Sequence, residues 1–141
     1  VVIAEQCRGV SEDEAMDVVG GYTAANDLSN RTHLEDETMY RIKAFDHSCP
    51  LGPAVATPGE VPQNPRVQMW LDGEKQQDSR DDEYVFGIPE VIAEASEYVT
   101  LEENDIILMG TPGGADALSD GDHVAIEVDG VGRLEHDVAV R

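Results

Sequence analysis

Alternating apolar and polar positions predict two β-hairpins in this chain. Residues 67–71 alternate in this way and lead into Asp72-Gly73, a pair typical of a two-residue type I′ turn. The second hairpin is predicted with strands at 124–128 and 131–138 around Asp129-Gly130.

Apolar runs predict further strands. Continuous runs at 1–4 and 106–109 are typical of buried strands, and the segment 22–28 is predicted to be a strand that ends near Asp27. Trp70 lies on an alternating strand and is expected in the core. Residues 50–65 contain so many prolines and glycines that no helix is expected there.

Start and stop signals predict short helices. Ser11 precedes three acidic residues and stands three positions before Glu14, which is the pattern of a capping box. This helix is expected to end at Gly20-Gly21. Pro89 suits the first position of a helix through residue 98. Residues 29–42 are weakly patterned and are expected to form a loop with one short helical turn.

These elements predict one α+β domain over residues 1–141, rich in β-structure and carrying two or three short helices. A chain of 141 residues can bury a hydrophobic core of its own.

The charge balance limits the partners of the protein. Acidic residues outnumber basic ones by 30 to 9, and the formal net charge is −21. Such a surface repels nucleic-acid phosphates and anionic lipids, so neither nucleic acid nor membrane is expected as a partner. The two cysteines lack metal-site or CxxC spacing, and we expect reduced thiols in a cytoplasmic protein.

Lysine is scarce, since only Lys43 and Lys75 occur. An acidic, lysine-poor surface favours a halophilic source, because concentrated salt screens the repulsion among the carboxylates. An ordinary acidic protein is the alternative.

Three segments each place one chemically capable group at the edge of an apolar run. They are GGYTAANDLSNR at 20–31, KAFDHSCPLGP at 43–53 and GTPGG at 110–114. The groups concerned are the Asp27 carboxylate, the Lys43 ammonium and the Thr111 hydroxyl beside glycine amides.

Each group has a structural and a functional interpretation when the residues are taken alone. Asp27 either caps the following turn or binds a hard cation such as Mg²⁺ or Mn²⁺. Lys43 either extends over Phe45 with its ammonium in water, pairs with Asp46, or meets an anionic ligand. Gly110 and Thr111 either form an ordinary turn or offer amides and a hydroxyl to a substrate oxygen.

In this order, the three segments resemble the fumarylacetoacetate hydrolase family, and the resemblance covers nearly the whole chain. It implies a mixed β-sandwich or roll of the C-terminal catalytic type, and a divalent-metal-dependent enzyme acting on 2-oxo or 4-oxo acids. The reactions of such enzymes include acylpyruvate-type C–C hydrolysis, oxaloacetate decarboxylation and isomerisation of 2-hydroxyhepta-2,4-diene-1,7-dioate-type acids. The implied partners are a small oxo-acid substrate and a second copy in a homodimer.

The resemblance also implies residue roles. Asp27 matches a metal ligand, and Lys43 matches the catalytic lysine of a Gly-Lys-[Ser/Gly/Ala]-Phe-Asp run, although Ile42 stands where glycine is usual. Gly110 and Thr111 match the substrate-binding Thr-Gly-Thr-Pro-x-Gly loop.

Arg31 is a candidate for binding a substrate carboxylate, because a guanidinium suits a bidentate contact. Its alternative is a salt bridge to Glu35 or Asp36. The family usually continues as Ala-Arg-Asp-x-Gln, whereas this chain has Asn-Arg-Thr-His-Leu at 30–34.

The remaining metal ligands of the family are a Glu-x-Glu pair on the strand that precedes the segment matched by residues 1–3. The chain begins after that pair, so we expect a fragment whose Mg²⁺ or Mn²⁺ has its other ligands outside this chain. The general acid/base of hydrolytic members, a His/Glu pair, is expected there as well. A non-catalytic acidic β-domain or oligomerisation remnant, and a simple divalent-cation binder, are the alternatives.

Overall fold

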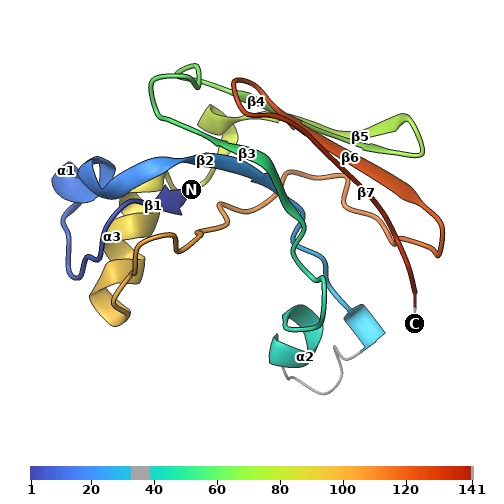
Figure 1. The fold of residues 1–141 in the computed structure, drawn as a ribbon, viewed down its shortest axis with the longest axis horizontal. Helices are drawn as coiled ribbons and strands as arrows, with labels where there is room; N and C mark the ends of the chain where they lie inside the picture. The colour runs from blue at the N-terminus through green and yellow to red at the C-terminus, as the bar shows by residue number, and fades with distance from the viewer. Residues whose placement is uncertain (33–38, 141) are drawn as a thin grey trace.

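The computed structural model describes residues 1–32 and 39–140, in which two antiparallel sheets are accompanied by short helices (Figure 1). The first sheet has the strand order β1-β2-β3 and the second has the order β5-β4-β6-β7. The strands are β1 (Val2–Ile3), β2 (Val19–Ala25), β3 (Leu51–Ala56), β4 (Arg66–Leu71), β5 (Glu74–Arg80), β6 (His123–Val128) and β7 (Gly132–Asp137). The α-helices are α1 (Glu12–Ala15), α2 (Met39–Lys43) and α3 (Ile88–Tyr98). This confirms the predicted β-rich α+β class.

One hydrophobic cluster lies between the first sheet and the helices α1 and α3. Its buried members come from β1, from the α1 region and the start of β2, from α3 and from the segment that follows α3: Val1, Ile3, Ala15, Val18, Val19, Ile92 and Leu101. A 3₁₀ turn, Met16–Val18, continues α1 and joins it directly to β2. This packing fixes the helical end of the molecule (Figure 1).

A second cluster joins the two sheets. Ala24 of β2 packs with Val124 and Ile126 of β6 and Leu134 of β7, and Val124 is fully buried. β2 therefore contributes to both clusters, with Val19 in the first and Ala24 in the second. This contact holds the end of β2 against the second sheet.

The start of β2 corrects the prediction for Gly20-Gly21. These residues do not end a helix, because β2 begins at Val19 and runs through both of them. A Cβ at Gly21 would lie 2.5 Å from the Ala56 carbonyl oxygen of β3, and one at Gly20 would lie 3.2 Å from the Ala4 Cα. The glycines therefore allow neighbouring chain segments to approach β2 closely.

Two strand predictions need correction. β2 ends at Ala25 rather than at residue 28. Residues 106–109 run beside β1, where the Ile107 amide donates to the Val1 carbonyl at 2.9 Å, but they are not a buried strand. Ile107 and Met109 pack against the first cluster, whereas Ile106 and Leu108 are 37% and 39% exposed. All four residues of 106–109 are apolar, but only alternate ones face the core.

Trp70 is not in the core as predicted. It is half-buried, and the Arg133 guanidinium lies 4.6 Å from its ring centroid, with the Lys75 ammonium at 5.7 Å. Cation–π contacts of this kind suit an aromatic ring on the solvent side of a sheet.

The two hairpin predictions and the predicted starts of α1 and α3 are confirmed. Of the loop expected at 29–42, residues 33–38 lie outside the described residues, and α2 begins at Met39. Asp72 and Gly73 have φ values of 51° and 82°, as a type I′ turn requires, and β6 and β7 pair as the second hairpin. Ser11 is the N-cap of α1, and Pro89 is in the first turn of α3. Strand β3 was not predicted, because its sequence contains Gly52 and Pro53.

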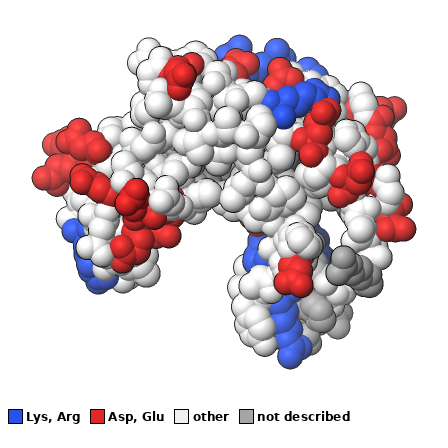
Figure 2. Space-filling model, in the orientation of Figure 1, with Lys and Arg blue, Asp and Glu red and all other residues white. Residues whose placement is uncertain are grey.

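Charged side chains are distributed unevenly over the surface. Figure 2 shows acidic groups crowded at the α1 and α3 end, while basic and acidic groups are interspersed over the second sheet. There Arg66 and Lys75 pair with Asp78, and Arg133 pairs with Glu127 and Glu135. None of the helices in the described ranges is both long enough and apolar enough to cross a membrane.

The close approach of β2 and β3 predicts that Gly21→Ala destabilises the fold. The added methyl group would lie 2.5 Å from the Ala56 oxygen and 2.7 Å from Val55 Cγ1. We expect a loss of about 1–3 kcal/mol in the free energy of unfolding, measured by urea denaturation. Gly59→Ala is the matched control, because a Cβ there meets nothing within 4 Å. Equal stability of the two variants would contradict the packing described.

Candidate functional site

The segment that follows β2 holds Asp27 in place through backbone hydrogen bonds. The Asn26 amide donates to the Pro50 carbonyl and the Leu28 amide donates to the Ser48 carbonyl, each at 3.0 Å. Asp27 thus projects from a stretch of chain that is bound on both sides to the segment preceding β3. A carboxylate anchored in this way has a defined position although its side chain is 50% exposed.

Helix α2 places Lys43 beside Asp27. Ile42, which is 4% exposed, anchors the helix, and its carbonyl accepts a hydrogen bond of 2.9 Å from the Asn30 amide. The next residue is Lys43, whose Nζ lies 2.7 Å from Asp27 Oδ2. Two motifs separated by 16 positions therefore meet in one ion pair.

The exposure of this ion pair shows that it contributes little to the stability of the fold. Lys43 and Asp27 are 36% and 50% exposed, and pairs of this kind are worth about 0–1 kcal/mol. The arrangement instead gives an ammonium and a carboxylate side by side, open to solvent. Such a pair can contact an anionic ligand and a cation at the same place.

Cys49 borders this ion pair. Burial raises the pKa of its thiol, the Asp27 carboxylate raises the pKa further, and the Lys43 ammonium partly offsets both. The thiol is therefore protonated at neutral pH. This agrees with a structural role for Cys49 rather than a nucleophilic one.

A hydrogen bond also links this region to the second sheet. Asn26 Nδ2 lies 2.9 Å from Nε2 of His136, which is on β7. The other ring nitrogen of His136, Nδ1, lies 3.3 Å from the Asp137 carbonyl oxygen, so both ring nitrogens have a polar partner. The residue before Asp27 is thus tied to a residue 110 positions away, a contact for which no motif or spacing in the chain is a signal.

The glycine-rich loop lies at a separate pocket of about 480 Å³. Its walls come from β5, the segment that precedes α3, α3 itself and the loop: Ser79, Glu83, Tyr84, Val85, Phe86, Val91, Met109, Gly110, Thr111, Pro112 and Gly113. Thr111 Oγ1 accepts a hydrogen bond of 2.9 Å from Gln77 Nε2. The loop therefore offers a hydroxyl group at the edge of a pocket lined by both polar and apolar groups.

The predicted site residues fall into two groups. Asp27 and Lys43 are in direct contact, whereas Gly110 and Thr111 line the pocket, and neither member of the ion pair is among the residues of its walls. Arg31 is exposed. Its alternative partners, Glu35 and Asp36, lie outside the described residues.

The described residues do not form a complete metal site. Within 1–32 and 39–140, no three His, Cys, Asp or Glu side chains are grouped so as to hold a cation. Asp27 supplies one carboxylate, and hard cations of the Mg²⁺ type need further oxygen ligands. Among the residues that the structure describes, Asp27 thus fits a single ligand of a metal centre.

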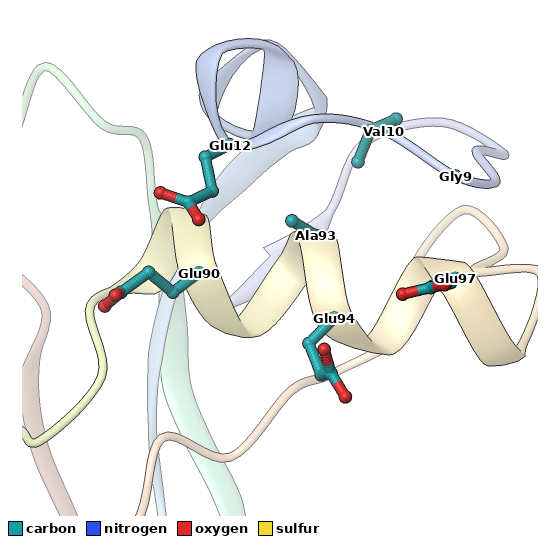
Figure 3. Close-up of a pocket in the computed structure, with 7 residues that line it drawn as sticks. All are labelled: Gly9, Val10, Glu12, Glu90, Ala93, Glu94 and Glu97. Atoms are coloured by element: carbon teal, nitrogen blue, oxygen red, sulfur yellow. The ribbon is translucent and has the colours of Figure 1, made fainter.

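A second cavity, of about 400 Å³, is rich in glutamates. Figure 3 shows Glu12, Glu90, Glu94 and Glu97 around it, on or next to the helices α1 and α3. Glu90 has a local structural role, since its carboxylate accepts the Gly87 amide hydrogen bond at 2.7 Å and caps α3. Helix capping thus accounts for Glu90, and the other three glutamates belong to the acidic surface of this end of the molecule.

The family model of the fumarylacetoacetate (FAA) hydrolase C-terminal region matches residues 1–139 of this chain. The chain belongs to the fumarylacetoacetate hydrolase family. The bifunctional isomerase/decarboxylase of 4-hydroxyphenylacetate degradation from Salmonella dublin is 38% identical over 98% of the chain, which spans 33% of that enzyme.

Solved structures of this family have the same fold. The 5-carboxymethyl-2-hydroxymuconate delta-isomerase of Mycobacterium smegmatis superimposes with a TM-score of 0.94 and 34% identity, over 99% of this chain and 56% of its own. The fumarylpyruvate hydrolase of Pseudomonas aeruginosa, in complex with Mn²⁺ and pyruvate, gives 0.90 and 26%, over 99% and 63%. The chain thus covers about a third to two thirds of these relatives, which are isomerases, decarboxylases and hydrolases.

The electrostatic contact between Cys49 and the ion pair can be measured. In a Cys7→Ser background, Lys43→Met should raise the pKa of the Cys49 thiol, because the cation that lowers it is lost. Asp27→Asn should lower that pKa. The measurement is the pH dependence of alkylation by iodoacetamide in the presence of a chelator, and the reaction should shift to higher pH for Lys43→Met and to lower pH for Asp27→Asn. Identical pH profiles in all three proteins would contradict the proximity.

Proposed function

We propose that this chain provides one metal ligand, the catalytic lysine and a substrate-binding loop to a divalent-metal-dependent enzyme that acts on 2-oxo or 4-oxo acids. The observation that carries the proposal is the 2.7 Å contact between Lys43 and Asp27. Each residue belongs to a different family motif, and the fold brings them together at the end of β2.

The chemistry of Lys43 supports this role. Its ammonium is fixed beside a carboxylate on a helix anchored by Ile42, so it remains close to any negative charge that arises next to Asp27. An oxo acid brings such charge in its carboxylate, and more develops when an enolate forms. A positioned cation stabilises developing charge more strongly in the transition state than in the ground state.

Asp27 is proposed as one ligand of Mg²⁺ or Mn²⁺, with the other ligands outside this chain. A bound divalent cation would chelate the carboxylate and 2-oxo oxygens of the substrate and favour enolate formation. The Mn²⁺ and pyruvate in the related Pseudomonas aeruginosa structure support this choice of cofactor and substrate class. Arg31 would bind a carboxylate of the substrate, and Gly110 and Thr111 would bind a distal oxygen.

The names of the relatives support three reactions: isomerisation, decarboxylation and hydrolysis of acylpyruvate-type acids. All three reactions depend on a labile C–C or C–H bond next to a 2-oxo group. The same set of residues can therefore serve each of them. The same fold hosts several chemistries, and the choice among them is made by the substrate pocket.

Asp27→Ala in the full-length protein should abolish turnover of acetylpyruvate and of oxaloacetate in the presence of Mg²⁺ or Mn²⁺, because a metal ligand is lost. The measurement pairs steady-state kinetics with Mn²⁺ titration by calorimetry. Asp13→Ala is the control, since it removes an exposed carboxylate on α1, outside the three motifs. Wild-type Mn²⁺ affinity and turnover in Asp27→Ala would remove Asp27 from the site. Inactivity of the wild-type protein on both substrates would favour a non-catalytic remnant.

Lys43→Met should lower kcat by about 10²–10³-fold, the effect typical of losing one group that stabilises developing negative charge. Mn²⁺ affinity should be retained, because the Asp27 carboxylate is still present. Lys75→Met makes the same change at the other lysine, which pairs with Asp78 on the second sheet, and should leave kcat unchanged. Equal kinetics for Lys43→Met and Lys75→Met would exclude a catalytic role for Lys43.

A further inference from the structure

Strand β5 contains one residue more than its partner β4 at a single point. Trp70 pairs with Lys75, but the preceding residue of β4, Met69, pairs with Gln77, so that Gln76 is the extra residue of a β-bulge. Lys75 lies over Trp70 on the outer face, and regular alternation would turn Gln77 to that same face. Because of the bulge, Gln77 shares the inner face with Met69, which packs against the core.

On that face Gln77 holds the glycine-rich loop by two hydrogen bonds. Its Nε2 lies 2.9 Å from Thr111 Oγ1 and 3.1 Å from the Pro112 carbonyl oxygen. The carbonyl can only accept, so the amide nitrogen must face it, and the same NH₂ group donates its second hydrogen to Thr111. The orientation of the amide therefore follows from the chemistry of its partners.

The backbone of the loop is fitted to the same bulge. Gly114, at φ +96°, packs so closely on the Gln76 carbonyl that a side chain there would overlap it. β5 thus fixes the loop at both of its sides, through the Gln77 amide and through the contact at Gly114.

These hydrogen bonds determine what Thr111 can do. Its oxygen accepts from Gln77, so the single hydroxyl proton is not used in that bond and remains to be donated. Thr111 lines the pocket of about 480 Å³ described above, together with apolar groups such as Val85, Phe86 and Met109. A hydroxyl that donates into this pocket selects an oxygen acceptor of the ligand, such as a carbonyl or a carboxylate.

We propose that Gln77 is a positioning residue for substrate: it holds Thr111 as a hydrogen-bond donor to an oxygen of the oxo acid bound at the pocket. This inference rests on the proposed function of Thr111. Gln77 acts through Thr111 and has no contact with the reacting atoms.

The test uses the full-length protein with Mn²⁺ and acetylpyruvate or oxaloacetate. Gln77→Glu keeps the shape but turns the donor into an acceptor, so the Thr111 proton is drawn to the new carboxylate and the substrate loses its donor. KM should rise about tenfold, with a smaller change in kcat, as expected for one hydrogen bond lost in binding. Gln63→Glu makes the same change on an exposed loop and should leave KM unaltered. Equal KM values for Gln77→Glu and wild type would overturn the proposal.

A double-mutant cycle separates positioning from a direct role. Gln77→Met removes both hydrogen bonds without adding charge and should raise KM severalfold, but it should have no further effect in a Thr111→Val background. Additive effects of the two substitutions would overturn the proposal.

Hydrogen exchange tests the inference without relying on activity. The amides of Gly110, Thr111, Gly113 and Gly114 should exchange faster in Gln77→Met than in wild type, because the loop loses its anchor. Unchanged exchange would show that Gln77 does not hold the loop. Absence of turnover in the wild type would instead count against the proposed function, and the exchange result would still decide whether the loop depends on Gln77.

Discussion

The architecture depends on the close packing that strand β2 permits. Gly20 and Gly21 let Ala4 and the β3 backbone approach β2, and the small side chain of Ala24 lets the second sheet pack on it. β2 therefore contributes to both hydrophobic clusters, and its end packs against the second sheet. The Asp27–Lys43 pair follows at that end, where the supporting backbone is bound on both sides. The geometry of the candidate site thus depends on residues whose side chains are absent or small.

Local signals in the sequence were sufficient where structure is decided locally. Asp72-Gly73 and Asp129-Gly130 predicted both hairpins because these residue types favour a tight turn through their own backbone conformation, and Ser11 marked the start of a helix. Glycine misled the prediction at Gly20-Gly21, because the same residue that ends helices also permits strands to approach closely. Composition likewise obscured β3, whose glycine and proline are tolerated in a strand that has β2 as its one partner in the sheet.

The candidate functional residues also divide into those with a local sequence signal and those that depend on distant contacts. Asp27, Lys43 and Thr111 could be chosen from motifs, since each stands at the end of an apolar run, and the meeting of the first two is seen only in the fold. Gln77 gave no signal, because its importance comes from a contact with Thr111 across 34 positions. His136 is a similar case, with its partner Asn26 at a separation of 110. Contacts of this range depend on strand register, which a pattern of residue types does not determine.

The bulge in β5 makes the number of residues in that strand as important as their identity. Many side chains would fit at position 76, since its carbonyl, rather than its side chain, meets the Gly114 backbone. Deleting residue 76, in contrast, would leave Gln77 opposite Met69 but would remove the carbonyl on which Gly114 packs, so that the loop would lose one of its two contacts with β5. The side chain of residue 76 is thus less constrained than the presence of its backbone, which completes the seat of the loop.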